Sequence, residues 1–181
     1  MTAETRLWQA VTGEHAMRLL KIMLVLLVCA AQPAMAGPFE DAVVAYDKRD
    51  YRTALDLISP LAEQGNADAQ FMLGRMYDSG HGVPKDYAAA VAWWRRAANQ
   101  GNAQAQVNLG YMYRLGQGVP QDDVQAHVWL SLAASRRSAV AEEDRKRIIE
   151  TIGFIELKLT DDQRAMAQKL AREWKPRPER Q

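Results

Sequence analysis

The sequence predicts an all-α fold in which helix-turn-helix units stack into an α-solenoid. The main observation is an internal repeat: residues 65–100 and 101–136 align without a gap, and eighteen of the 36 aligned pairs are identical. Each copy also contains two helical patterns separated by a turn rich in glycine and proline. A repeat of 20–50 residues is typical of solenoids. We therefore expect one domain built from stacked helix pairs.

The first half of each repeat has apolar and small residues on one helical face. They are Ala69, Leu73, Gly74, Met76 and Tyr77 in the first copy and Ala105, Leu109, Gly110, Met112 and Tyr113 in the second. A glycine inside a helix costs about 0.5–1 kcal/mol relative to alanine. Its presence in both copies predicts a close backbone approach, and we expect Gly74 to pack onto the small Ala90 or Ala97 of the following helix.

The second half of each repeat begins with a turn and continues as a second helix. Gly80-His81-Gly82-Val83-Pro84 forms the turn in the first copy, and Gly116-Gln117-Gly118-Val119-Pro120 forms it in the second. Asp86 and Asp122 follow the turns and are placed to cap the next helix. The packing face is expected at Ala90, Trp93, Ala97 and Ala98 and, 36 residues later, at Ala126, Trp129, Ala133 and Ala134. Trp94 aligns with Leu130 and is expected between repeats, and Gly101 is expected to end the first of these helices.

Residues 37–64 are expected to form a degenerate N-terminal repeat. Asp50, Tyr51, Ala54 and Ala62 match the residues that lie 36 positions later, whereas the Gly-x-Gly-Val-Pro turn is missing. Terminal repeats of such arrays are usually atypical because one side faces water.

Residues 137–175 predict two C-terminal capping helices. The first is expected over 139–158, with a bend at Gly153, and the second begins at the capping-box pattern of Thr160 to Gln163. The second helix is expected to bury Met166, Leu170 and Trp174. Two prolines follow it, and residues 176–181 are expected to be disordered.

Residues 17–36 have the order of a secretory signal peptide: a positive start, an apolar run and an A-x-A exit. We expect cleavage after Ala36 and a periplasmic or secreted chain of 145 residues. Residues 1–16, which match neither signal nor domain, are interpreted as a non-native extension from an upstream start codon. Two alternatives stay open, namely an uncleaved membrane anchor and lipidation of Cys29. The anchor is disfavoured because the apolar run is shorter than the roughly 20 residues of a membrane span. Lipidation is disfavoured because the branched Val28 stands directly before Cys29, where a lipobox has a small residue.

The composition of residues 37–181 narrows the class of function. The segment has twenty basic and twenty acidic residues and no cysteine. A nucleic-acid-binding protein usually shows a basic excess, so we expect no nucleic-acid partner. His81 and His127 lack partners at metal-ligand spacing, and no nucleophile-elbow, P-loop or dinucleotide motif is present. The sequence therefore predicts no catalytic residue, no cofactor and no metal.

The repeat resembles the Sel-one-like repeat family, relatives of the tetratricopeptide repeat. The residues that carry the resemblance are Leu73, Gly74, Tyr77, Gly80, Gly82, Asp86 and Trp93, and then Leu109, Gly110, Tyr113, Gly116, Gly118, Asp122 and Trp129. The resemblance covers about residues 39–136, and the closing segment 159–174 is similar to the tail of related bacterial secreted proteins. It implies a solenoid that serves as a protein-interaction scaffold, with some members in periplasmic signalling or envelope complexes.

The expected binding residues lie on the first helix of each repeat and point away from the second helix. They are Phe71, Arg75 and Asp78 in one copy and Val107, Tyr111 and Arg114 in the other. The copies differ at these positions, whereas the expected core is largely shared. Because the first helices of a solenoid line its concave surface, and because aromatic and arginine side chains are favoured interface anchors, we expect a protein or peptide to bind there. A merely solvated face is the alternative for these residues.

The leading hypothesis is thus a non-catalytic scaffold or adaptor of the cell envelope. A cell-wall enzyme or a β-lactam-binding protein is the first alternative, because cysteine-rich secreted relatives in the family are linked to that activity. The lack of cysteine in residues 37–181 departs from those relatives. A purely structural subunit of an envelope complex is the second alternative, since arrays generally need at least three repeats to be stable.

Overall fold

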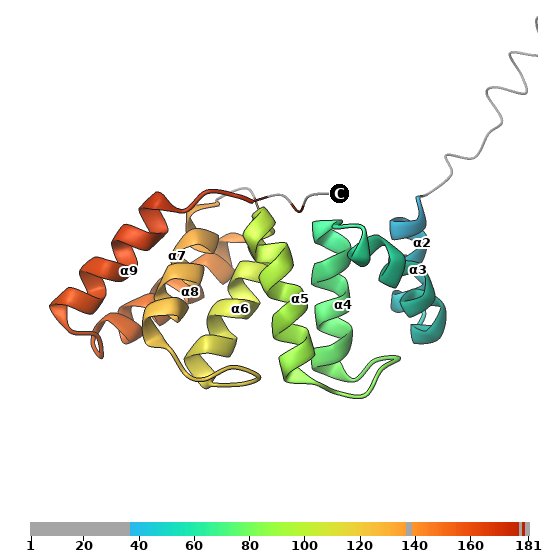
Figure 1. Cartoon of the computed structure of the whole chain (residues 1–181), viewed down its shortest axis with the longest axis horizontal. Coiled ribbons are helices and arrows are strands. Elements are labelled where there is room, and N and C mark those ends of the chain that lie inside the picture. The colour runs from blue at the N-terminus through green and yellow to red at the C-terminus, as the bar shows by residue number, and fades with distance from the viewer. Residues whose placement is uncertain (1–36, 137–138, 178, 180–181) are drawn as a thin grey trace, which may run out of the picture. The chain divides into compact units, whose positions relative to one another are not determined.

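The computed structural model describes residues 37–136, 139–177 and 179, so the expected extension 1–16 and signal peptide 17–36 lie outside the described residues. The described part of the chain folds into α-helices joined by short turns, which confirms the predicted all-α class (Figure 1). The helices are α2 (Pro38–Asp47), α3 (Tyr51–Glu63), α4 (Ala67–Ser79), α5 (Tyr87–Gln100), α6 (Ala103–Leu115), α7 (Asp123–Ser135), α8 (Glu142–Glu156) and α9 (Asp161–Glu173).

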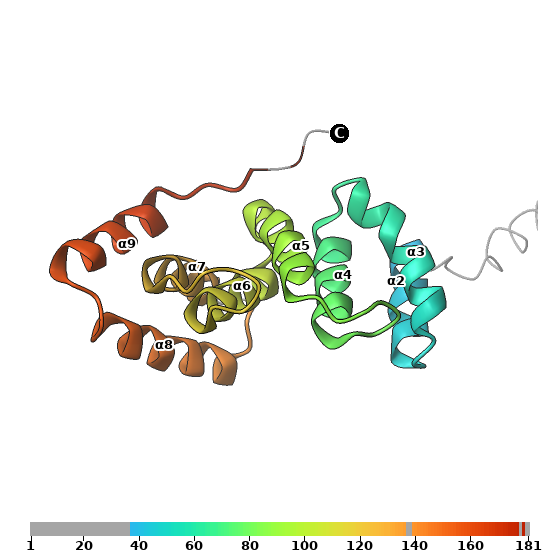
Figure 2. The same cartoon turned by 60° about the horizontal axis from the view of Figure 1, so that its bottom comes forward.

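The helices stack in chain order, as a solenoid requires. Each helix from α2 to α7 packs against the next one along the chain, and α7 also packs against α9. Figure 2 shows α8 and α9 on opposite sides of α7, so the last two helices enclose α7 instead of pairing like the helices of a repeat. The predicted solenoid is therefore confirmed, but the helices at its C-terminal end are not paired like those of the repeats.

Side-chain caps define where the repeat helices begin. Asp86 accepts hydrogen bonds from the backbone N–H groups of Ala88 and Ala89, and Asp122 accepts one from Gln125. Asp50 caps α3 in the same way through Thr53, which supports its alignment with Asp86. Such caps satisfy backbone donors that the first turn of a helix leaves unpaired.

The close approach inside each repeat involves a different residue from the one predicted. A Cβ at Gly74 would lie 2.5 Å from Cδ1 and Nε1 of Trp94, and a Cβ at Gly110 would lie 2.7 Å from Cγ of Leu130. The expectation that Gly74 packs onto Ala90 or Ala97 is therefore wrong. The glycine makes room for a large side chain, Trp94, which is 1% exposed.

The buried tryptophan of the first repeat is accordingly Trp94 and not Trp93. Residue 94 lies four positions after Ala90 and three before Ala97, so it shares their helical face. Its indole N–H donates to the carbonyl of Phe71 at 3.2 Å. Trp93 is half-buried against the hydrophobic residues of α2, α3 and α4. Its counterpart Trp129 lies in the core, as predicted.

The C-terminal helices differ from the prediction in length and in the face they bury. Helix α8 covers a shorter range than the expected 139–158 and runs uninterrupted through the exposed Gly153. On α9, Met166 is 54% exposed and Leu170 is also exposed, so their predicted burial is wrong. The fully buried Ala167 faces α7 instead, because a small side chain allows the two helices to approach closely.

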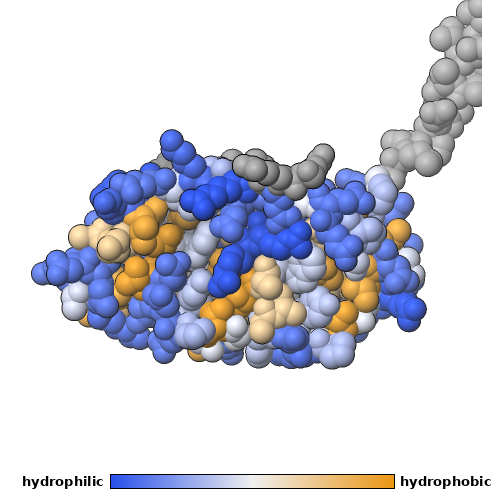
Figure 3. Space-filling view, in the orientation of Figure 1, coloured by the Kyte–Doolittle hydropathy of each residue, from blue (hydrophilic) through white to orange (hydrophobic). Residues whose placement is uncertain are grey.

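The hydrophobic core runs along the helix stack as three neighbouring clusters. The N-terminal cluster joins α2, α3 and α4, the central cluster joins α5, α6, α7 and α9, and the C-terminal cluster joins α6, α7 and α8. On the face drawn in Figure 3, hydrophobic residues form separate patches with hydrophilic residues between them. Across the described ranges, no helix has the length and apolar character needed to cross a membrane.

Candidate partner-binding surfaces

The first candidate surface, here called the A-face, consists of the outward sides of α2, α4, α6 and α8. It contains the binding residues predicted on the first helices of the repeats. In its N-terminal half, the guanidinium carbon of Arg75 lies 5.3 Å from the ring centroid of Tyr46 and 5.9 Å from that of Phe71. Phe71 is half-buried against the central cluster, so it forms a fixed base beneath the exposed arginine. Arg75 thus has its planar group presented between two aromatic rings.

The C-terminal half of the A-face contains a pocket of about 200 Å³ between α6 and α8. The predicted residues Val107 and Tyr111 line it, together with Gln104, Val140, Asp144, Arg147 and Ile148. Arg147 and Asp144 form an ion pair of 2.6 Å. Because Val107 and Tyr111 also pack against the cluster of α8, α8 encloses a part of the surface that was expected to be open.

The structure therefore brings together four of the six predicted binding residues in two pairs. Phe71 and Arg75 form the aromatic half, and Val107 and Tyr111 form one wall of the pocket. Asp78 and Arg114 lie in the last turns of α4 and α6 and are half-buried. They belong to neither the aromatic contact nor the pocket lining.

The two histidines of the described chain make structural contacts. His81 stacks on Tyr51 with the ring centroids 4.2 Å apart, and its Nδ1 is 2.9 Å from the hydroxyl of Tyr46. His127 is buried in α7, and its Nε2 lies 2.9 Å from Oε1 of Glu156 in α8. His81 thus ties the turn after α4 to α2 and α3, and His127 ties α7 to α8. No group of three or more potential metal ligands occurs within the described ranges.

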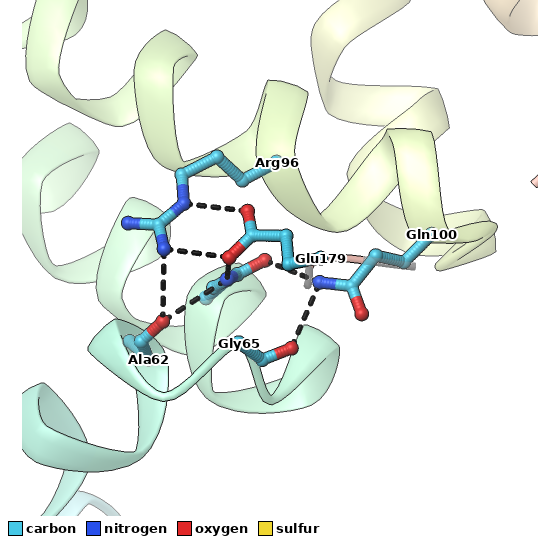
Figure 4. A network of polar contacts seen from close by, with 6 residues as sticks. Ala62, Gly65, Arg96, Gln100 and Glu179 are labelled. Carbon is cyan, nitrogen blue, oxygen red and sulfur yellow. Dashed lines mark hydrogen bonds and ion pairs between the residues drawn. The ribbon is translucent and has the colours of Figure 1, made fainter. Parts of the chain in front are cut away.

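A second candidate surface lies at the C-terminal end of α5, and sequence reasoning missed it. Arg96 donates from Nε and Nη2 to the two carboxylate oxygens of Glu179, each at 2.7 Å (Figure 4). Nε2 of Gln70 donates to the same carboxylate at 3.0 Å and to the carbonyl of Ala62, also at 3.0 Å. Gln100 in turn donates to Oε1 of Gln70 at 2.8 Å. We call Arg96, Gln70 and Gln100 the carboxylate site.

The electrostatics of this site favour a negatively charged group. The hydrogen bonds from Arg96 lower the pKa of the Glu179 carboxyl, and burial opposes this effect. The hydrogen bond to Glu179 raises the pKa of Arg96. The side chains are 37% and 28% exposed, so the pair is partly screened by water and salt. The strength of the ion pair comes mainly from its bidentate geometry, in which the guanidinium donates one hydrogen bond to each carboxylate oxygen.

One signal in the sequence could have pointed to this site. Gln70 and Gln106 are identical polar residues on the helical face that also carries Leu73 and Leu109. A polar side chain retained at a core position in both copies indicates a buried hydrogen-bonding role. Both are fully buried, and Gln106 donates to the carbonyl of Ala98 as Gln70 does to that of Ala62.

Comparisons with known proteins agree with the repeat described above. The family model of the Sel1 repeat matches residues 67–102 and 103–138, a frame two residues later than the one chosen from the sequence. Among solved structures, a protective antigen of uropathogenic Escherichia coli with an SLR fold is 30% identical, with a TM-score of 0.66. A Sel1 repeat protein from Oxalobacter formigenes is also 30% identical, with a TM-score of 0.57.

These similarities cover only a part of the relatives. The alignment with the antigen spans 76% of this chain and 29% of the antigen chain. The alignment with the Oxalobacter formigenes protein spans 66% of this chain and 46% of the other. The comparison with curated proteins finds no match.

The fold defines an α-helical repeat protein of the solenoid type. The chain contains two Sel1 repeats and has the fold of these SLR-fold structures. Proteins of this class are generally non-catalytic scaffolds for protein interactions.

Proposed function

We propose that this protein is a non-catalytic scaffold or adaptor of the bacterial cell envelope that binds a protein or peptide on its A-face. One observation carries the proposal: the two repeats keep the same helix caps and the same glycine contact positions but present different side chains on this face. Arg75 stands between aromatic rings where the second repeat has Tyr111 beside a pocket. Arginine and tyrosine on a rigid base are the side chains that most often dominate binding energy at interfaces.

The location of the protein is a second part of the proposal. Support comes from the order of charged, apolar and small residues in 17–36, which is that of a signal peptide. Cleavage after Ala36 leaves a chain of 145 residues without cysteine, so an oxidising compartment would add no disulfide. The intact mass of the chain purified from the periplasmic fraction tests this part. A chain that still carries residues 17–36 would contradict it.

The A-face is tested by the double variant Arg75→Ala with Tyr111→Ala. We expect it to recover at least about tenfold less of the partner than the wild type in crosslinked pull-downs from the native envelope, since hot-spot residues contribute about 2 kcal/mol or more each. The matched control is Met166→Ala with Arg172→Ala, which removes an exposed apolar side chain and an exposed arginine from α9, outside the A-face.

Two results would contradict the proposed function. The first is equal recovery by the A-face variant and the wild type while circular dichroism shows that both are folded. The second is turnover of peptidoglycan or covalent capture of a labelled β-lactam by the purified chain, which would favour an enzyme or a β-lactam-binding protein.

A further inference from the structure

The chain following α9 crosses the helix stack in the manner of a bound peptide. The ring centroid of Trp174 lies 6.5 Å from that of Trp129 on α7. The backbone N–H of Arg177 then donates to the carbonyl of Asn99 at the end of α5, at 2.8 Å. Glu179 ends this path at the carboxylate site. Of this segment the structure describes residues 174–177 and 179, and the disorder expected for residues 176–181 stays a prediction.

The carboxylate site is built by the repeats themselves. Gln70 is fully buried, and its amide is fixed by the carbonyl of Ala62 and by Gln100. Gln100 is fixed in turn by the carbonyl of Gly65 at 2.9 Å. The guanidinium carbon of Arg96 lies 4.5 Å from the ring centroid of Trp93, so the cation rests on an aromatic surface. Donors held in place in this way lose little conformational entropy when they bind an anion.

The site belongs to the first repeat alone. The residues 36 positions after Arg96 and Gln100 are Leu132 and Arg136, so the second repeat has no arginine in the equivalent place on its second helix. Leu132 is buried in the central cluster. The shared glutamine forms the same backbone contact in both repeats, but only the first repeat has an arginine at the position of Arg96 and a glutamine at the position of Gln100. On the face drawn in Figure 3, strongly hydrophilic residues cover the region of α5 between more hydrophobic patches.

We propose that the carboxylate site binds an aspartate or glutamate side chain of an extended peptide segment in a partner protein, and that the C-terminal segment of this chain occupies it in cis through Glu179. The segment thereby competes with the partner peptide. Glu179 takes three charge-assisted hydrogen bonds from the site, one from Gln70 and two from Arg96. A competing carboxylate in the same position forms the same bonds, and the backbone of its peptide replaces the contact of Arg177 with Asn99.

The experiment measures how strongly the full chain binds a peptide that carries this carboxylate. The probe is a fluorescein-labelled peptide with the sequence of residues 172–181, followed by fluorescence anisotropy at low salt. The wild type is compared with Glu179→Gln, which keeps the size of the side chain but loses its charge. If the cis segment fills the site about nine-tenths of the time, Glu179→Gln binds the probe about tenfold more tightly than the wild type. The matched control is Glu173→Gln, an exposed glutamate at the end of α9, which leaves the affinity unchanged.

Two further arms test whether the carboxylate and the arginine carry the binding. A probe in which glutamine replaces the glutamate corresponding to Glu179, while the glutamate corresponding to Glu173 and the free C-terminal carboxylate are kept, is expected to bind Glu179→Gln at least about tenfold more weakly. The double variant Arg96→Leu with Glu179→Gln has leucine where the second repeat has Leu132. We expect it to bind the unmodified probe at least about tenfold more weakly than the single variant Glu179→Gln does. Its far-ultraviolet circular dichroism checks that the helices remain.

Equal affinity of the wild type and Glu179→Gln for the probe would overturn the proposal, because the segment would then not compete. Equal affinity for the charged and the glutamine probe would overturn it too, since the C-terminal carboxylate or an uncharged contact would then carry the binding. The inference goes beyond the A-face proposal and does not depend on it. Displacement of the segment can be observed even if the Arg75 and Tyr111 variants capture a partner normally.

Discussion

Replacing Gly74 by alanine tests the contact that defines the packing of each repeat. The new Cβ would lie 2.5 Å from two ring atoms of Trp94 and 3.1 Å from a third. The ring is buried and hydrogen-bonded to the carbonyl of Phe71, so it has little freedom to move. Overpacking of a core costs about 1–3 kcal/mol, and a displaced indole N–H loses about 0.5–1.5 kcal/mol of hydrogen bonding.

The gain in helix propensity opposes this cost but is smaller. Alanine is favoured over glycine inside a helix by about 0.5–1 kcal/mol. The net loss for Gly74→Ala is therefore about 1–3 kcal/mol in the free energy of unfolding. For a chain of this size, that corresponds to a fall in Tm of about 2–12 °C.

The chain contains a matched control for this substitution. Gly153 lies inside α8 and is exposed, and a Cβ there would meet no atom within 4 Å. Gly153→Ala keeps the propensity gain without the clash, so its Tm should rise by about 1–4 °C. Differential scanning calorimetry of both variants and the wild type gives the comparison. If Gly74→Ala raised the Tm as Gly153→Ala does, the tight contact with Trp94 would be refuted.

Three further predictions concern single side chains. Asp86→Ala should lower the free energy of unfolding by about 1 kcal/mol in urea titrations, because two backbone donors lose their cap. Gln70→Leu should cost about 1 kcal/mol more than Gln106→Leu in the same titrations, because the amide of Gln70 takes part in three hydrogen bonds, whereas within the described chain Oε1 of Gln106 has no partner. Acid should detach Glu179: its pKa is lowered in the folded chain, so the bond with Arg96 stabilises the fold above the ordinary carboxyl pKa and is lost as the pH falls through the lowered value. The ¹⁵Nε–Hε signal of Arg96 should therefore change in that acid range in the wild type and stay constant in Glu179→Gln.

The repeat itself could be predicted from the sequence because its signals are local. Identical residues at a spacing of 36 indicated a duplicated unit, and Asp86 and Asp122 act on backbone groups only two or three residues away. The solenoid follows from such units by stacking. Local turn chemistry and periodicity were sufficient for this level of description.

Errors arose where the answer depended on which part of a neighbouring helix lies closest. Trp93 and Trp94 are both large and apolar, and identity between the copies favoured Trp93, whereas the structure buries Trp94 against Gly74. On α9, the apolar side chains of Met166 and Leu170 favoured them as core residues, but the helix approaches α7 through Ala167. When the buried residue is small and its exposed neighbours are large and apolar, the hydrophobic periodicity points to the wrong face of the helix.

The two surfaces differed in how much the sequence could show. The A-face residues were found because the two repeats diverge there, although their grouping into an aromatic half and a pocket required α2 and α8. The carboxylate site was missed because its contact joins Gln70 and Arg96 to Glu179, which lies 109 positions after Gln70 in the chain. Arg96 also has no arginine counterpart in the second repeat, which has Leu132 at that position.

The most direct test of the scaffold account places a photo-crosslinker on the A-face. The amino acid p-benzoylphenylalanine is introduced at Tyr111 or, as the control, at the exposed Ala92 on α5, and the cells that naturally make the protein are irradiated. The account predicts a crosslinked product of defined mass from position 111 that position 92 does not give. The same product from both positions, or products from position 92 alone, would contradict the account.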